Sequence, residues 1–322
     1  EIIMPFIAVK RIMAIKAETT RGTAISVAAA DFDMRLRDIT IDTEIESYDR
    51  PFASGSHSRA SAVMGKKKAT VTCKYDMALG ASVAVSPKAR KLFIASGAEE
   101  IVTPSTSVLY RPNAGNDDVT GVTYTIKVME IASSGNCIIR TVKGAMCNIV
   151  LEGELGQPLV ANCTFVGAYV GDADGAAIAI TSPDTSVPPS IIGATITVAT
   201  IPQKISKFSL DFGNQVELEM DPADSTGYLA AYISGRQPKL TIDPQASLLA
   251  TDPVYTRWAA GTESAFSMTT ATSSSMKWTV SATKAQLITN KPADRNGAII
   301  YQQEYQLHES GGYDEWGILQ SA

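Results

Sequence analysis

The chain has 322 residues and a formal net charge of −5, with 45% hydrophobic and 19% charged residues, a balance that excludes a disordered chain, a coiled coil and a collagen-like fibre. The length fits two domains better than one, at roughly 150 residues each. The acidic balance argues against a protein that grips nucleic acid through its phosphates, and two histidines leave few options for metal or acid–base chemistry.

The N-terminal run Ile2–Val9 is apolar, but Pro5 interrupts it and Lys10 and Arg11 follow it. A secretory signal carries its positive charge before the apolar stretch. No segment of the sequence reaches the ~18 consecutive apolar residues of a membrane helix. We therefore expect a cytoplasmic product without a membrane partner.

Alternation with a period of two residues begins at Phe32 and dominates the chain. Phe32, Met34 and Leu36 alternate with charged residues, and the phase then slips by one, so that Ile39 belongs to the new apolar series. This pattern predicts a strand of roughly 15 residues with an acidic outer face and a bulge near Arg37–Asp38. Because a long strand is unusual at a sheet edge, we expect neighbours on both of its sides.

The rest of the first half alternates strands with one capped helix. Ser86-Pro87 and Gly97 are typical start and stop signals of a helix. The predicted elements are a loop over Ser47–Gly65, a strand over Lys66–Tyr75, a helix over Lys88–Ser96, and hairpins over Thr123–Ile131 with Cys137–Val142 and Met146–Leu155 with Leu159–Val166.

A segment rich in Gly, Ala, Ser and Pro, Gly171–Ala199, reads as a linker with one short strand at Ala194–Val198, and a second series of elements follows it. That series is a strand over Lys207–Met220, a helix over Ser225–Ser234, a strand after Gly235, a helix from Asp252-Pro253 to Gly261, and hairpins over Ser264–Thr270 with Met276–Ser281 and Ala285–Asn290 with Ala298–Leu307.

Both series run in the same order: long acidic-faced strand, connector, short strand, capped helix, hairpin, hairpin. Six elements in the same order indicate an internal duplication, and the period is too long for a solenoid repeat. We therefore expect two copies of one mostly β domain at 1–170 and 200–310, with the linker at 171–199 and a C-terminal tail at 311–322.

Four stretches together resemble the tail tube proteins of long-tailed bacteriophages: AIKAETTRGTAISV, SKFSLDFGNQVELEMDP, GRQPKLTIDPQA and RWAAGTESAFSM. The resemblance covers roughly Ile12–Glu309. It implies tandem β-sandwich or barrel-like tube domains, each with a short flanking helix, whose inner sheets join side by side into rings that stack into a DNA-conducting tube.

The family normally places six tube domains in a ring, so two fused domains imply a pseudo-hexameric trimer. The resemblance also implies a structural virion protein of the phage tail, with other copies of itself, a tape measure protein, and terminator and tip proteins as partners. DNA would be a cargo that is not tightly bound, and no cofactor, metal or enzymatic activity is expected.

Duplex DNA carries about one negative charge per 1.7 Å, so a wall lined with carboxylates would repel it and keep it moving. Acidic residues that alternate with apolar ones on the predicted strands are the candidates for the lumen, although an ordinary solvated sheet face is the competing interpretation. These candidates are Asp38, Asp42, Glu44, Glu46, Glu217, Glu219 and Asp221, with Glu152 and Glu154 in second rank.

Contacts between rings are expected at the loop Ser47–Gly65 and at the tail, since long loops in compact domains are usually functional or disordered. The tail is apolar enough that we expect it to dock, preferably on a neighbouring copy. The candidate contact residues are Phe52, Arg59, Lys66, Lys67, Lys68, Tyr313 and Trp316.

An enzyme is a weak alternative, because His57 and His308 lie in different predicted domains and no phosphate loop or nucleophile elbow is present in the sequence. A distal tail or baseplate hub protein built on the same duplicated domain is the closer alternative, and an adhesin-like β-sandwich is a third. The four cysteines are expected to be free thiols that act as small hydrophobes.

Overall fold

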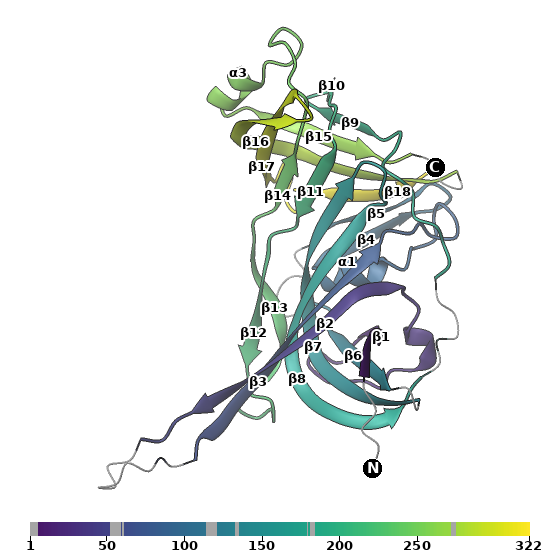
Figure 1. The fold of residues 1–322 in the computed structure, drawn as a ribbon, viewed down its shortest axis with the longest axis vertical. Coiled ribbons are helices and arrows are strands. Elements are labelled where there is room, and N and C mark those ends of the chain that lie inside the picture. The colour runs from purple at the N-terminus through teal and green to yellow at the C-terminus, as the bar shows by residue number, and fades with distance from the viewer. Residues whose placement is uncertain are drawn as a thin grey trace.

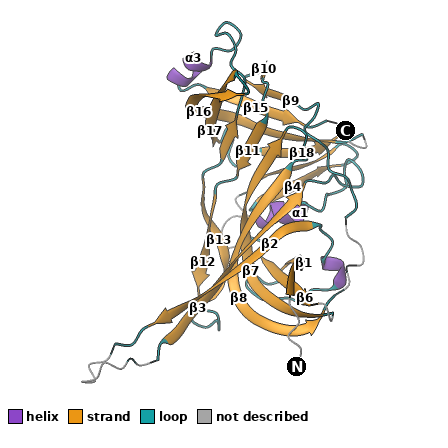
Figure 2. Cartoon of the chain, viewed as in Figure 1, coloured by secondary structure: helices purple, strands orange, loops and turns teal. Residues whose placement is uncertain are grey.

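Strands dominate the structure, a computed structural model that describes residues 6–51, 59, 61–113, 121–132, 135–178, 180, 184–271 and 275–322, with side chains from residue 10 (Figures 1 and 2). The first half contains β1 (Phe6–Ala17), η1 (Ala29–Asp31), β2 (Leu36–Tyr48), β3 (Val63–Asp76), α1 (Arg90–Ala95), β4 (Ala98–Thr103), β5 (Ser107–Pro112), β6 (Tyr124–Ala132), β7 (Asn136–Glu154) and β8 (Val160–Ala176). The second contains β9 (Thr195–Val198), β10 (Ile201–Pro202), β11 (Lys207–Asp211), β12 (Asn214–Met220), β13 (Tyr228–Arg236), β14 (Lys239–Ile242), α3 (Val254–Ala259), β15 (Glu263–Thr269), β16 (Lys277–Arg295), β17 (Ala298–His308) and β18 (Gly317–Ser321).

One antiparallel sheet of 16 strands runs through both halves. Its central path contains eight strands in the order β2-β3-β8-β7-β11-β14-β17-β16, which we call the wall. The two halves meet within the wall, where Leu151 of β7 pairs with Leu210 of β11. The hairpin β12–β13 forms a separate two-stranded sheet. In the part of the chain that the structure describes, the mostly β fold with two short α-helices is thus confirmed.

Alternation along each wall strand decides which side chains enter the core. In β3, Ala69, Val71 and Cys73 are buried, while Thr70 and Thr72 between them face the opposite side. All four cysteines are free and buried, as expected for thiols that act as small hydrophobes.

The main core is continuous across the two halves. Phe212, just after β11, stacks on Trp316 with 3.9 Å between ring centroids and on Phe93 of α1 with 6.4 Å. All three side chains are buried. Burial of large aromatic rings contributes strongly to stability, so the halves are held together by packing as well as by strand pairing.

Helices α1 and α3 and the bulge lie where the sequence predicts them. α1 and α3 fall inside the predicted helical segments. The register of β2 against β3 shifts between Arg37 and Thr40, and Asp38 has a positive φ of 53°. The expected start of this strand at Phe32 is wrong, because β2 begins at Leu36 and a 3-10 turn precedes it.

The expectation that this strand has two neighbours is also wrong for the described part of the chain. β2 pairs only with β3 and is the last strand of the sheet. In Figure 1 the two strands project from the body of the molecule as a long hairpin.

The helix predicted over Ser225–Ser234 is wrong, since this segment contains a turn followed by β13. Two alanines and apolar neighbours give it a helical pattern, but close packing selects the extended form. A Cβ atom on Gly144 of β7 would lie 2.6 Å from the Cα of Ala230, so the two backbones are in close contact.

Some strands are longer than predicted. The two strands expected at Cys137–Val142 and Met146–Leu155 are one strand, β7, and the two expected at Met276–Ser281 and Ala285–Asn290 are likewise one strand, β16. β8 continues to Ala176, within the segment predicted to be a linker. The short strand in that segment is present as β9, which pairs with β15.

Candidate functional site, the polar face of the wall

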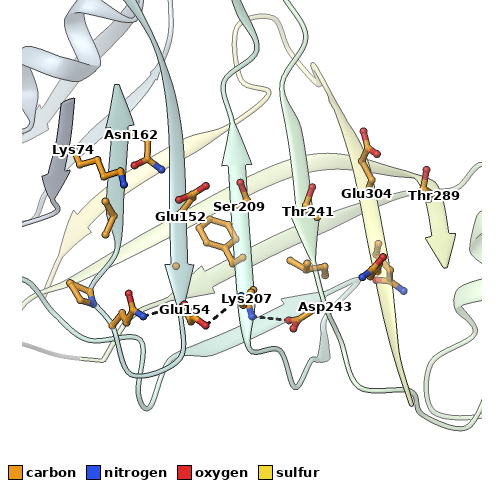
Figure 3. Close-up of a pocket in the computed structure, with 18 of the residues that line it drawn as sticks. Lys74, Glu152, Glu154, Asn162, Lys207, Ser209, Thr241, Asp243, Thr289 and Glu304 are labelled. Carbon is orange, nitrogen blue, oxygen red and sulfur yellow. Dashed lines mark hydrogen bonds and ion pairs between the residues drawn. The ribbon is translucent and has the colours of Figure 1, made fainter. Parts of the chain in front are cut away.

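The face of the wall that points away from the core carries polar side chains on every strand, and we call it the polar face. Figure 3 shows Lys74 of β3, Asn162 of β8, Glu152 of β7, Ser209 of β11 and Glu304 of β17 on this side of the sheet. They line a hollow of about 670 Å³ that spans strands from both halves. The site is therefore a surface built from eight strands and not a cleft in one domain.

Carboxylates and ammonium groups alternate across neighbouring strands of the polar face. In an antiparallel sheet, side chains that lie opposite or diagonal to each other on one face are close enough to form ion pairs. The pairs are Glu46–Lys66 at 3.2 Å, Glu44–Lys68 at 3.0 Å, Asp38–Lys74 at 3.0 Å, Glu154–Lys207 at 3.5 Å and Glu304–Lys239 at 2.9 Å.

These pairs make the face polar and close to charge-balanced. The hydrogen bond from Lys68 to Glu44 raises the pKa of the lysine above its ordinary value, and Glu304 raises the pKa of Lys239 in the same way. Both lysines therefore stay charged at neutral pH. Each exposed pair contributes little to stability, but together the pairs occupy five ammonium groups that could otherwise bind an anion.

Two of the predicted lumen acids on the wall lack an ion-pair partner among the residues that the structure describes. Asp42 lies opposite Thr70 of β3, and Glu152 lies opposite Ser209 of β11. Among the six predicted acids on the polar face, these two have no ion-pair partner in the described chain, because the other four are paired with lysines.

The predicted lumen acids of the second half lie on a different element. Glu217 and Glu219 belong to β12, and Asp221 follows it. Val216 and Leu218 of this hairpin pack in a small apolar cluster around Met146.

Ion pairs fix the hairpin β12–β13 in this position. Glu219 pairs with Arg21 at 2.5 Å, and Asp224 at the hairpin turn pairs with Lys143 of β7. The acidic pattern of this segment therefore belongs to a hairpin laid against the wall and not to a wall strand.

The candidates for contacts between rings have separate locations. Lys66 and Lys68 form ion pairs with carboxylates of β2. The backbone N–H of Lys67 donates to the Thr226 carbonyl at 2.9 Å. Arg59 is exposed. Phe52 lies outside the described residues.

The tail docks on its own chain. Its last strand, β18, pairs with both β16 and β5, so the expected docking on a neighbouring copy is not needed to cover it. Trp316 is 1% exposed and stacks on Phe212, which corrects its assignment as a ring contact. Tyr313 is 46% exposed and remains available.

Sequence reasoning missed five charged residues of the polar face and its rim: Lys74, Lys207, Lys239, Asp243 and Glu304. Each has a partner or neighbour on another strand that is distant in sequence, so the pairing appears only once the register is known. Alternation of polar and apolar residues within the strands is the signal in the sequence that could have indicated them.

The described residues contain no group of three or more His, Cys, Asp or Glu side chains arranged to hold a metal ion. In the same part of the chain, no helix has both the length and the apolar character needed to cross a membrane.

Comparison with known proteins gives one family. A family model described as phage tail tube protein matches residues 9–307. A search of the curated proteins found no match.

Proposed function

The chain belongs to the phage tail tube protein family and is thus a structural component of the virion that assembles into a tube; from this premise, we propose that copies of the chain close into rings that stack around a DNA-conducting bore. The wall would form the inner surface of each ring, with the polar face toward the bore.

The observation that carries this proposal is the continuity of the wall. Four of its strands come from each half of the chain, and β7 pairs with β11 to join the two sets without a break. We propose that these halves are two tube domains, at 1–170 and 200–310, with 171–199 as the connection and 311–322 as the tail. Three chains would then supply six domains to a closed pseudo-hexameric ring.

The chemistry of the polar face suits a surface over which DNA slides. Five of its lysines are engaged by carboxylates, as in the Lys68–Glu44 and Lys239–Glu304 pairs, which limits their attraction for phosphates. Glu152, opposite Ser209, adds negative charge without an ion-pair partner in the described chain, and this charge would repel the duplex. We propose that the bore is lined by charge-balanced lysine–carboxylate pairs together with a few unpaired carboxylates, and not by a uniformly acidic surface.

We assign the stacking of rings to the hairpin β2–β3 and its loop, with Arg59, Lys67 and Tyr313 as contact candidates. The same tube would enclose a tape measure protein and end on terminator and tip proteins, after assembly in the host cytoplasm. These partners come from the family resemblance.

Electron microscopy of the purified chain tests the proposal. Rings that stack into tubes are the expected result, and native mass spectrometry of a ring should give three copies. Rings that never stack, even with an initiator present, would favour a distal tail or hub protein. Monomers at all concentrations would overturn the proposal.

A further inference from the structure

Two edges of the wall lack a strand partner in the described chain. At one end, β2 pairs only with β3. At the other end, β15 pairs with β16 only as far as Gln286, and no strand of the described chain covers that side of β16 beyond this point. Unpaired edges present N–H and C=O groups to other chains, so both are candidate interaction surfaces.

The two halves correspond in detail around β7 and β16. Tyr124 pairs with Ala145 and Ile126 with Val142, across a register shift. In the second half, Ser264 pairs with Ala285 and Phe266 with Ala282, across the same kind of shift. Each of these second-half residues follows its counterpart by the same number of positions, which makes β16 the equivalent of β7. A register shift of β16 against β17 between Leu287 and Thr289 adds one residue to this spacing from Thr289 onward.

The other wall strands follow the same correspondence. Thr40 pairs with Thr72, and Thr72 with Thr164. Ser209 pairs with Thr241, and Thr241 with Glu304. Each of these two lines of paired residues crosses three neighbouring strands, β2-β3-β8 in the first half and β11-β14-β17 in the second. The comparison makes β2 the equivalent of β11 and Thr40 the equivalent of Ser209.

The junction between β7 and β11 within the chain therefore corresponds to the two unpaired edges, with β16 in the place of β7 and β2 in the place of β11. Within the chain, Ser209 lies opposite Glu152, and Asp211 lies opposite Val150. We propose that β2 of one copy pairs antiparallel with β16 of a second copy in this same register. The equivalent residues place Thr40 opposite Ala293, and Asp42 opposite Lys291.

Charge supports this register. Asp42 and Lys291 are both exposed, and neither has an ion-pair partner in the described part of its own chain. The proposed pairing puts the carboxylate and the ammonium group directly across from each other, where opposite charges stabilise a pair of strands. Pro292 would lie opposite Ile41 and lacks an N–H group, so that pair would have one hydrogen bond fewer than its internal equivalent.

Apolar surface on both sides of the junction supports it as well. Inside the chain, Phe212 and Asn214 follow β11 and cover α1, through the stacking on Phe93 and a hydrogen bond to the Ser96 carbonyl. The equivalent helix, α3, is left uncovered. Trp258 of α3 is 38% exposed and donates to the carbonyl of Ile288, which is itself 50% exposed beside the open edge of β16.

The hairpin β2–β3 carries the complementary apolar side chains. In the second half, the hairpin β12–β13 follows β11 and buries apolar side chains against Met146 of β7. The corresponding part of β2–β3, beyond the proposed junction, leaves its apolar side chains exposed. These residues are Ile45, Tyr48, Val63 and Met64. Exposed apolar groups on both surfaces indicate that a second copy of the chain covers them.

This register rests on the proposed rings, and a cysteine pair, Thr40→Cys with Ala293→Cys, tests it. The internal N–H donations from Phe212 to Ile149 and from Leu155 to Ser206 make Ser209 and Glu152 a non-hydrogen-bonded pair. The equivalent pair should have Cα atoms about 4.5 Å apart, within the range for a disulfide. The four natural cysteines are buried and should not compete.

Under mild oxidation of assembled protein, the double variant should give a covalent trimer on non-reducing gels. Each single variant should give none, and Ser209→Cys with Glu152→Cys should oxidise within one chain without raising its mass. Rings that form without cross-linking would overturn the register but leave the proposed function intact. Chains that stay monomeric without the cysteine changes would overturn both.

A charge exchange gives a second test that needs no cysteine. Asp42→Lys and Lys291→Asp alone should each weaken ring formation by about tenfold or more, because like charges then face each other across the junction. The two changes combined should restore it. A double variant as impaired as the single variants would overturn the pairing of these two residues.

Discussion

Asn214 donates a hydrogen bond from Nδ2 to the carbonyl oxygen of Ser96 at 2.8 Å, and so connects the start of β12 to the C-terminal cap of α1. The same amide nitrogen donates to the Cys147 carbonyl at 3.2 Å, and its Oδ1 accepts a bond from Arg236 at 3.0 Å. One buried side chain thereby joins the two halves of the chain.

Replacing this side chain should destabilise the seam between the halves. Asn214→Ala removes the partners of two buried carbonyl groups, and each group left unsatisfied costs about 1–3 kcal/mol. We expect the free energy of unfolding in urea to fall by about 2 kcal/mol or more. Gln215→Ala, at the exposed neighbouring position, should change it by less than about 0.5 kcal/mol. Equal effects of the two substitutions would contradict the role of Asn214.

Acid should weaken the docking of β12–β13 on β7. Burial opposes ionisation of Asp224, but hydrogen bonds from Lys143 and Thr226 outweigh it and hold the pKa of the carboxyl below its ordinary value of 3.8. The ionised group therefore stabilises the fold above this value, and the contribution is lost as the pH falls through the lower, folded value.

The comparison of wild type with Asp224→Asn measures this effect. The wild type should be more stable at neutral pH, and the difference should shrink as the pH falls below about 4. Lys143→Gln removes the partner and should reproduce the loss at neutral pH. A difference that does not vary with pH would show that the Asp224 charge is not what holds the hairpin.

Trp316 should be essential to the fold of a single chain. Because it is buried against Phe212, Trp316→Ala should cost about 3–5 kcal/mol and lower the melting temperature before any assembly takes place. Tyr313→Ala, in the same tail but exposed, is the matched control and should leave monomer stability almost unchanged. If thermal unfolding of monomers shows no loss for Trp316→Ala, the tail does not dock as described.

The charge of the polar face should affect the passage of DNA more than assembly. Glu152→Lys places an ammonium group without an ion-pair partner on the face, where it would attract phosphates. Virions carrying it should have normal tails in micrographs and reduced DNA delivery, and Glu152→Gln should have the smaller effect. Normal delivery by the lysine variant would contradict the placement of this face toward the bore.

Local signals in the sequence predicted most of the elements. Alternation identified β3 and β17, and the Ser86-Pro87 start signal located α1. The same signals failed where tertiary contacts decide, as at Tyr228–Ala231, which follows a helical pattern but is extended because Ala230 packs against Gly144.

Partners across the sheet could not be predicted from one sequence. The acids Glu44 and Glu154 are visible as a pattern, but their lysines lie on other strands and are found only through the register. The tail is similar, since its apolar residues indicate docking but not the place, and the place is set by the pairing of β18 between β16 and β5.

The central claim is that one chain supplies two of the six equivalent parts of a ring, with the wall continuous within each chain and between chains. Cryo-electron microscopy of assembled tubes counts the chains per ring most directly. We predict three chains per ring, with β2 of each beside β16 of the next. A ring of six chains, or a ring in which these two strands lie apart, would contradict the account.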